Sequence, residues 1–91
     1  MEKSKKKSAQ FPGYRVQIYN GRKSELLRRR SEFLSLFPDA EAYTLYDAPE
    51  YKLQIGDFRT RLEAEKFLKD VTRDYGSAFV VRTMINPPNE D

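Results

Sequence analysis

Two short segments of the chain, residues 14–19 and 51–55, alternate between apolar and polar side chains. A period of two with β-branched residues predicts strands that bury one face and expose the other. The set expected on the buried face is Tyr14, Val16, Ile18, Tyr51, Leu53 and Ile55. The set expected on the other face is Arg15, Gln17, Tyr19, Lys52 and Gln54.

The segment between these strands, residues 24–37, carries leucines and phenylalanines at helical spacing. Ser24 is suited to cap the start of this helix, because its hydroxyl can accept a backbone N–H of the first turn. Pro38 ends it, since the residue before a proline is disfavoured in the helical conformation. Residues 28–30 are three consecutive arginines that spread around the helix, so we expect a solvated face here and no single binding patch.

A second helix follows the second of these strands. Thr60 and Glu63 form a T-x-x-E capping box, in which each side chain satisfies a backbone donor at the start of the helix. Apolar residues then recur at helical spacing over residues 64–75. Gly76 is the expected stop, because glycine readily adopts the left-handed conformation that ends many helices.

Two more strands complete the pattern, over residues 42–47 and 78–85. The turn at residues 48–50 is so short that the strands on its two sides form an antiparallel hairpin. The element order is strand, helix, strand, strand, helix, strand. With right-handed crossovers, this order predicts an α+β fold of the split βαβ (βαββαβ, ferredoxin-like) type, a four-stranded antiparallel sheet with both helices on one face.

The sequence also repeats itself: residues 14–18 read YRVQI and residues 51–55 read YKLQI. In the split βαβ arrangement these two strands are the central pair, so both glutamines, Gln17 and Gln54, stand at the centre of the helix-free face. Amides donate and accept hydrogen bonds, so this face suits a glycan or single-stranded nucleic acid. An exposed sheet face also carries polar residues when it binds nothing, and the pattern leaves this alternative open.

Composition narrows the possible chemistry. The 91 residues make one small domain, which we expect at residues 13–85, between a flexible basic linker (residues 1–12) and a tail (residues 86–91). The net charge is only +3, and its excess lies in the first ten residues. The absence of Cys and His excludes zinc sites and Ser-His-Asp triads as usually built, and we expect no metal and no cofactor. No segment reads as a membrane span or a signal peptide, although a longer parent protein could supply one.

Residues 51–71, with YGSAFVV at 75–81, resemble the second half of a SPOR domain, the sporulation-related repeat of bacterial cell-wall proteins, and YRVQI resembles its first strand. The resemblance covers residues 13–84. Asp57 stands where the family usually has Pro, Lys52 where it usually has Arg, and the turn at residues 19–22 differs from the usual one. The matching positions of the second half are Tyr51, Lys52, Leu53, Ile55, Gly56, Phe58, Thr60, Glu63, Ala64 and Glu65.

This resemblance implies a module that binds peptidoglycan, favours glycan strands without stem peptides and locates a larger parent protein at the division septum of the bacterial cell envelope. By position, it makes four residues glycan contacts: Gln17, Asn20, Lys52 and Val81. The expected geometry of the open face adds Arg15, Tyr19 and Gln54, with Tyr19 placed to stack on a sugar ring. Binding would use several hydrogen bonds and stacking, and no bond would be broken.

Three other functions fit parts of the sequence: nucleic-acid binding, catalysis and protein–protein adaptation. RNA-recognition modules share this element order, but they carry aromatic residues on the central strands, where this chain has Lys52 and Gln54, so we expect no nucleic acid. A small phosphatase-like enzyme could use Asn20 and Arg22, but no glycine-rich phosphate loop surrounds them. The acidic pairs of the chain are more typical of helix starts and solvated surfaces than of catalysis. A protein–protein adaptor that uses an edge strand stays open.

Overall fold

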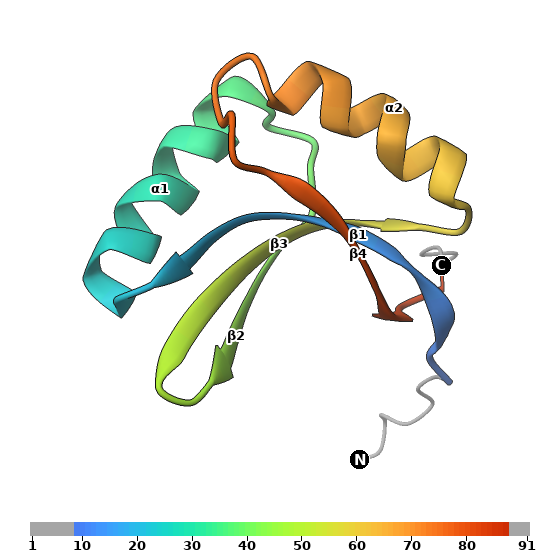
Figure 1. Cartoon of the computed structure of the whole chain (residues 1–91), viewed down its shortest axis with the longest axis horizontal. Helices are drawn as coiled ribbons and strands as arrows, with labels where there is room; N and C mark the ends of the chain where they lie inside the picture. The colour runs from blue at the N-terminus through green and yellow to red at the C-terminus, as the bar shows by residue number, and fades with distance from the viewer. Residues whose placement is uncertain (1–8, 88–91) are drawn as a thin grey trace.

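The computed structural model describes residues 9–87, and the element order is the one that the sequence predicts. The elements are β1 (Phe11–Gly21), α1 (Lys23–Leu36), β2 (Ala42–Asp47), β3 (Glu50–Phe58), α2 (Arg61–Val71) and β4 (Phe79–Ile85). All neighbouring strands are antiparallel, in the order β2-β3-β1-β4, so the repeated strands β1 and β3 form the central pair as expected. Figure 1 shows both helices on one side of the sheet, and the split βαβ fold is confirmed.

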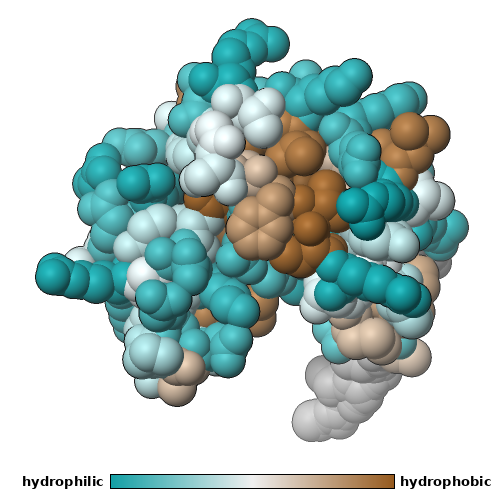
Figure 2. Space-filling view, viewed as in Figure 1, coloured by the Kyte–Doolittle hydropathy of each residue, from teal (hydrophilic) through white to brown (hydrophobic). Residues whose placement is uncertain are grey.

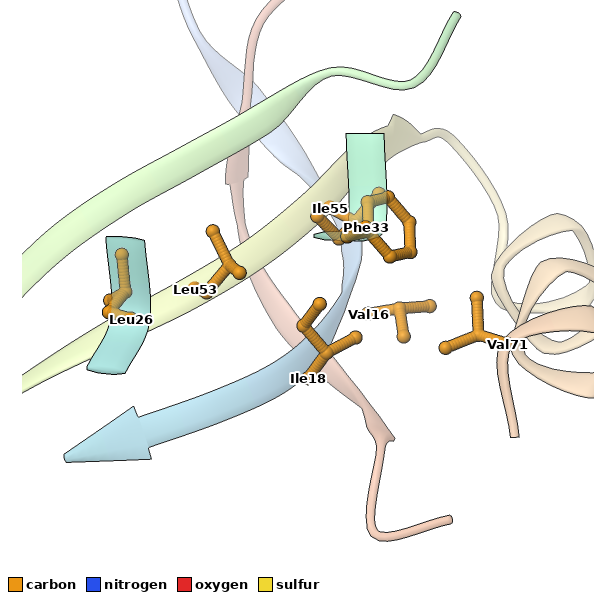
Figure 3. Close-up of a cluster of buried hydrophobic side chains, with 7 residues drawn as sticks. All are labelled: Val16, Ile18, Leu26, Phe33, Leu53, Ile55 and Val71. Carbon is orange, nitrogen blue, oxygen red and sulfur yellow. The ribbon is translucent and has the colours of Figure 1, made fainter. Parts of the chain in front are cut away.

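The core lies between the sheet and the two helices. Figure 3 shows its centre, where apolar side chains of β1 and β3 point towards those of α1 and α2. Fully burying one such side chain stabilises the fold by about 1.5–3 kcal/mol. Tyr51 packs against this cluster as the alternation predicts, whereas Tyr14 is only half-buried and lies outside it. The seven buried members are Val16, Ile18, Leu26, Phe33, Leu53, Ile55 and Val71.

The start of α1 differs from the prediction. The helix begins at Lys23, so the N-cap position falls on Arg22, whose side chain makes no capping hydrogen bond, and Ser24 lies inside the first turn. The prediction of a Ser24 cap was therefore wrong. The end agrees well: Phe37 donates its N–H to the carbonyl of Phe33 at 2.8 Å, and the proline follows directly.

The start of α2 agrees with the prediction, but its end does not. The Thr60 hydroxyl accepts the N–H of Glu63 at 3.2 Å, and the Glu63 carboxylate accepts the N–H of Arg59 at 3.2 Å, one residue before the usual partner. The helix ends at Val71, so the prediction of Gly76 as its stop was wrong. The chain leaves the helix through turns in which the carbonyl of Val71 accepts the N–H of Tyr75 at 2.8 Å. None of the helices in residues 9–87 is long and apolar enough to cross a membrane.

Two bulges interrupt the pairing of β1 with β3. Gln17 pairs with Gln54, and the next pair is Tyr19 with Leu53, so Ile18 is an extra residue of β1. An extra residue reverses which side of the sheet the following side chains face. Tyr19 therefore shares the side of Leu53, towards the helices.

The second bulge lies in β3 and contains Gly56, which has a φ of +86°. A side chain at this position would meet the ring of Phe58, because an added Cβ would lie 2.3 Å from a ring carbon. The bulge turns Phe58 towards α2, where its ring lies 5.4 Å from that of Phe67. It also turns Asp57 to the helix-free face, which matters for the site.

Candidate functional site

The centre of the helix-free face is the pair Gln17 and Gln54. These residues oppose each other across the central strands, and Gln54 Nε2 donates to Gln17 Oε1 at 3.0 Å. Each is the glutamine of one copy of the repeated strand, so the two copies meet at this pair. They lie on the expected face, flanked by Tyr43 of β2 and Phe79 of β4.

The expectation that these glutamines are exposed was wrong. Gln17 is 7% exposed and Gln54 is 6% exposed. In Figure 1 the β2–β3 hairpin and the lower end of β4 both bend away from the helices, so the helix-free face is concave and its centre is sheltered by its neighbours. Gln54 Oε1 has no hydrogen-bond partner in the described part of the chain, which is unusual for a buried polar atom.

Arg15 belongs to a network and is not a free cation. The residue is 5% exposed, its Nη2 lies 3.2 Å from Asp57 Oδ1, and its guanidinium lies 3.9 Å from the centre of the Tyr43 ring. Asp57 also accepts the Tyr43 hydroxyl and, at 3.1 Å, the backbone N–H of Asn86. We call these four residues the Arg15–Asp57 network. It ties β1, β2, β3 and the segment after β4 together, so Arg15 organises the face and presents little surface to a ligand.

The network also fixes the protonation of Tyr43. Burial raises the pKa of the Tyr43 hydroxyl, and its hydrogen bond to the Asp57 carboxylate raises that pKa further. The hydroxyl therefore keeps its proton near neutral pH and serves as a donor to Asp57, while the side chain of Asn86 donates to its oxygen at 3.2 Å.

The exposed polar groups of the face lie at the other end of β1 and β3. Asn20 pairs with Lys52 across the strands, and both side chains reach acidic partners beside the hairpin turn. Lys52 Nζ lies 2.8 Å from Asp47 Oδ2 and holds the pKa of that carboxyl below its usual value, while Asn20 Nδ2 donates to Glu50 Oε1 at 2.6 Å. Exposed pairs of this kind contribute little to stability, because water screens them, so ligand groups can replace them at little cost.

Tyr19 does not lie on this face, and the prediction that it stacks on a sugar there was wrong. The bulge at Ile18 turns its ring towards the helices, where the guanidinium of Arg29 lies 5.2 Å from the ring centre. Its hydroxyl donates to the carbonyl of Arg22 at 3.3 Å. The same bulge places Asn20 on the helix-free face.

The aromatic edge of the face comes from β4 instead. Phe79 pairs with Gln17 and is 50% exposed, and the half-buried Val81 pairs with Arg15. Figure 2 shows the apolar surface over β4. Phe79 was missed by sequence reasoning, although the pairing of β4 with β1 would have placed it beside the glutamines.

Two other residues of the face were also missed. Counting pairs outwards from the hairpin turn places Tyr43 opposite Gln54, so the sequence contained this signal. Asp57 could not be placed in this way, because strict alternation puts it on the helix side and only the Gly56 bulge turns it outwards.

The fold and this face define a class of protein: a split βαβ module suited to binding, with a shallow, concave polar surface that carries amides, the partly exposed cation of Lys52 and the exposed ring of Phe79. The family model of the SPOR domain matches residues 11–82, so the chain belongs to the SPOR family. SPOR domains are non-catalytic modules that bind peptidoglycan and target proteins to the septum. No curated protein and no solved structure matches the chain.

Proposed function

We propose that the chain binds peptidoglycan glycan strands that lack stem peptides, on the helix-free face of its sheet. Through this binding it holds a parent protein on the wall side of the bacterial cell envelope, at the septum. The observation that carries the proposal is the Gln17–Gln54 pair at the bottom of a concave face, surrounded by the exposed Asn20 and Phe79 and the half-buried Lys52.

A glycan strand offers what this face can bind. Its hydroxyl and acetamido groups can bond to Asn20, Lys52 and the amide of Gln17, each contributing about 0.5–1.5 kcal/mol. The apolar side of a sugar ring can lie on Phe79, which is half exposed beside Gln17. A stem peptide on every second sugar would hold the strand away from so shallow a face, which accounts for the preference for bare strands.

The test is co-sedimentation of the purified chain with peptidoglycan sacculi, before and after an amidase removes the stem peptides. We expect more protein in the pellet after amidase treatment. Asn20→Ala and Lys52→Ala should each weaken binding several-fold, because each removes one contact of about 1 kcal/mol. Both residues make only exposed side-chain contacts, so the fold should persist, as circular dichroism can verify.

Lys66→Ala is the matched control for Lys52→Ala, because Lys66 is an exposed lysine on α2, away from the helix-free face. Its pelleting should equal that of the unaltered chain. If Asn20→Ala and Lys52→Ala pellet as well as this control does, the ligand does not lie on the helix-free face.

A further inference from the structure

A hollow opens where β1 runs past the start of β4. The last pair between these strands is Gln17 with Phe79, but β1 continues through Ile18–Gly21. Along this stretch the edge of β1 away from β3 has no strand neighbour in the described residues. The hollow has a volume of about 310 Å³, and its walls include Asn20 from the helix-free face and Arg29 from α1. It therefore connects the two sides of the sheet.

Arg29 enters this hollow with unused hydrogen-bonding capacity. Its Nε donates to Glu25 at 2.9 Å, and within residues 9–87 this is the only hydrogen bond of its guanidinium. The side chain is 36% exposed, and its guanidinium carbon lies over the ring of Tyr19, 5.2 Å from the ring centre. The two terminal nitrogens are thus held in place and are free to bind an anion. The neighbouring Arg28 differs, since it donates to both Glu25 and Glu32.

The two cations that the central strands contribute to the face, Lys52 and Arg15, already have carboxylate partners. Lys52 pairs with Asp47 at 2.8 Å, and Arg15 pairs with Asp57 at 3.2 Å. Arg29 shares its own partner, Glu25, with Arg28. A carboxylate on a ligand that lies over Gln17 and Asn20 would therefore find its best donor at Arg29, through the gap beside β1.

We propose that Arg29 binds the lactyl carboxylate of muramic acid and thereby recognises glycan strands whose stem peptides have been removed. This inference rests on the proposed function. While a stem peptide is attached, the lactyl group is a neutral amide, and hydrolysis of that amide leaves one carboxylate per disaccharide. A guanidinium binds a carboxylate with two parallel hydrogen bonds, so Arg29 can distinguish the two forms by charge as well as by size.

The test compares two forms of one ligand: stem-peptide-free glycan strands with free carboxylates, and the same strands after carbodiimide coupling to methylamine. Affinity is measured by fluorescence anisotropy of end-labelled strands. We expect the unaltered chain to bind the free-carboxylate form roughly tenfold more tightly than the amidated form, because a hydrogen bond between charged groups contributes free energy of this size. Arg29→Gln should bind both forms equally, near the affinity of the unaltered chain for the amidated form. Arg29→Lys keeps the charge but cannot form the two parallel hydrogen bonds of a guanidinium, so it should retain part of the preference.

Arg30→Gln is the matched control, because it makes the same change at an exposed position of the same helix, outside the walls of the hollow. It should keep the full preference. If the unaltered chain binds both forms equally well, or if Arg30→Gln loses the preference as Arg29→Gln does, the role of Arg29 is refuted while the proposed function stands. If the unaltered chain binds neither form, the proposed function fails, and this inference fails with it.

Discussion

The substitution Asp57→Asn tests the Arg15–Asp57 network. It leaves the shape of the side chain almost unchanged but removes the negative charge beside an arginine that is only 5% exposed. Removing one partner of a buried ion pair costs about 3–5 kcal/mol, because the remaining charge stays buried without compensation. The Asp57 side chain is itself 17% exposed, so water can compensate in part, and we expect about 3 kcal/mol.

That loss is large for a domain of this size, whose total stability is on the order of 5–10 kcal/mol. The assay is equilibrium unfolding in urea, followed by circular dichroism. With an m-value of about 1 kcal/mol/M, a loss of this size lowers the midpoint by roughly 3 M. Asp47→Asn is the matched control: it removes the charge of a side chain that is 67% exposed, and it should leave the midpoint almost unchanged.

A double substitution separates the buried charge from other effects. Replacing both charges, as in Arg15→Met with Asp57→Asn, leaves no uncompensated ion, so the pair should be more stable than Asp57→Asn alone. The reasoning is refuted if Asp57→Asn costs less than about 1 kcal/mol, since the network would then contribute no more than an exposed pair does.

Two further predictions concern a glycine and a helix. Gly56→Ala should lower the melting temperature by roughly 8 °C or more, because a side chain at a φ of +86° is strained and meets the Phe58 ring; Gly76→Ala, with no atom within 4 Å of the added carbon, should change it little. The hydrogen bonds from Arg28 and Arg29 lower the pKa of Glu25 from 4.5 to about 2, so its stabilising effect is complete above pH 4.5 and disappears as the pH falls to about 2. The difference in melting temperature between the unaltered chain and Glu25→Gln should shrink over that pH range, and a difference that stays constant would contradict this assignment.

The fold was predictable because its signals are periodic and local. The alternation in β1 and β3 identified the buried faces of Val16, Ile18, Leu53 and Ile55, and the repeat identified the central strands. The face of the sheet on which Tyr19 lies was not predictable. One extra residue in a strand moves every following side chain to the opposite face, and the sequence does not clearly mark this bulge.

The burial of the two glutamines was not predictable either. A period of two indicates which face of a sheet a residue occupies, but burial on the helix-free face depends on how strongly the sheet bends. Gln17 and Gln54 occupy the expected face, yet they are sheltered between Tyr43 and Phe79, whose positions follow from the pairing of the outer strands. The end of α2 was misplaced for a related reason: Tyr75 packs against the core at helical spacing although the helix ends at Val71.

The two ends of the helix-free face hold their charges differently, and this difference separates stability from binding. At one end Arg15 and Asp57 are sheltered from water. A ligand group that replaced either partner would leave the other charge buried and unpaired. At the other end Lys52 and Asn20 have exposed acidic partners, which water or a ligand can replace at little cost. Substitutions at the first end should therefore appear in unfolding experiments, whereas substitutions at the second end should appear in binding experiments and leave unfolding almost unchanged.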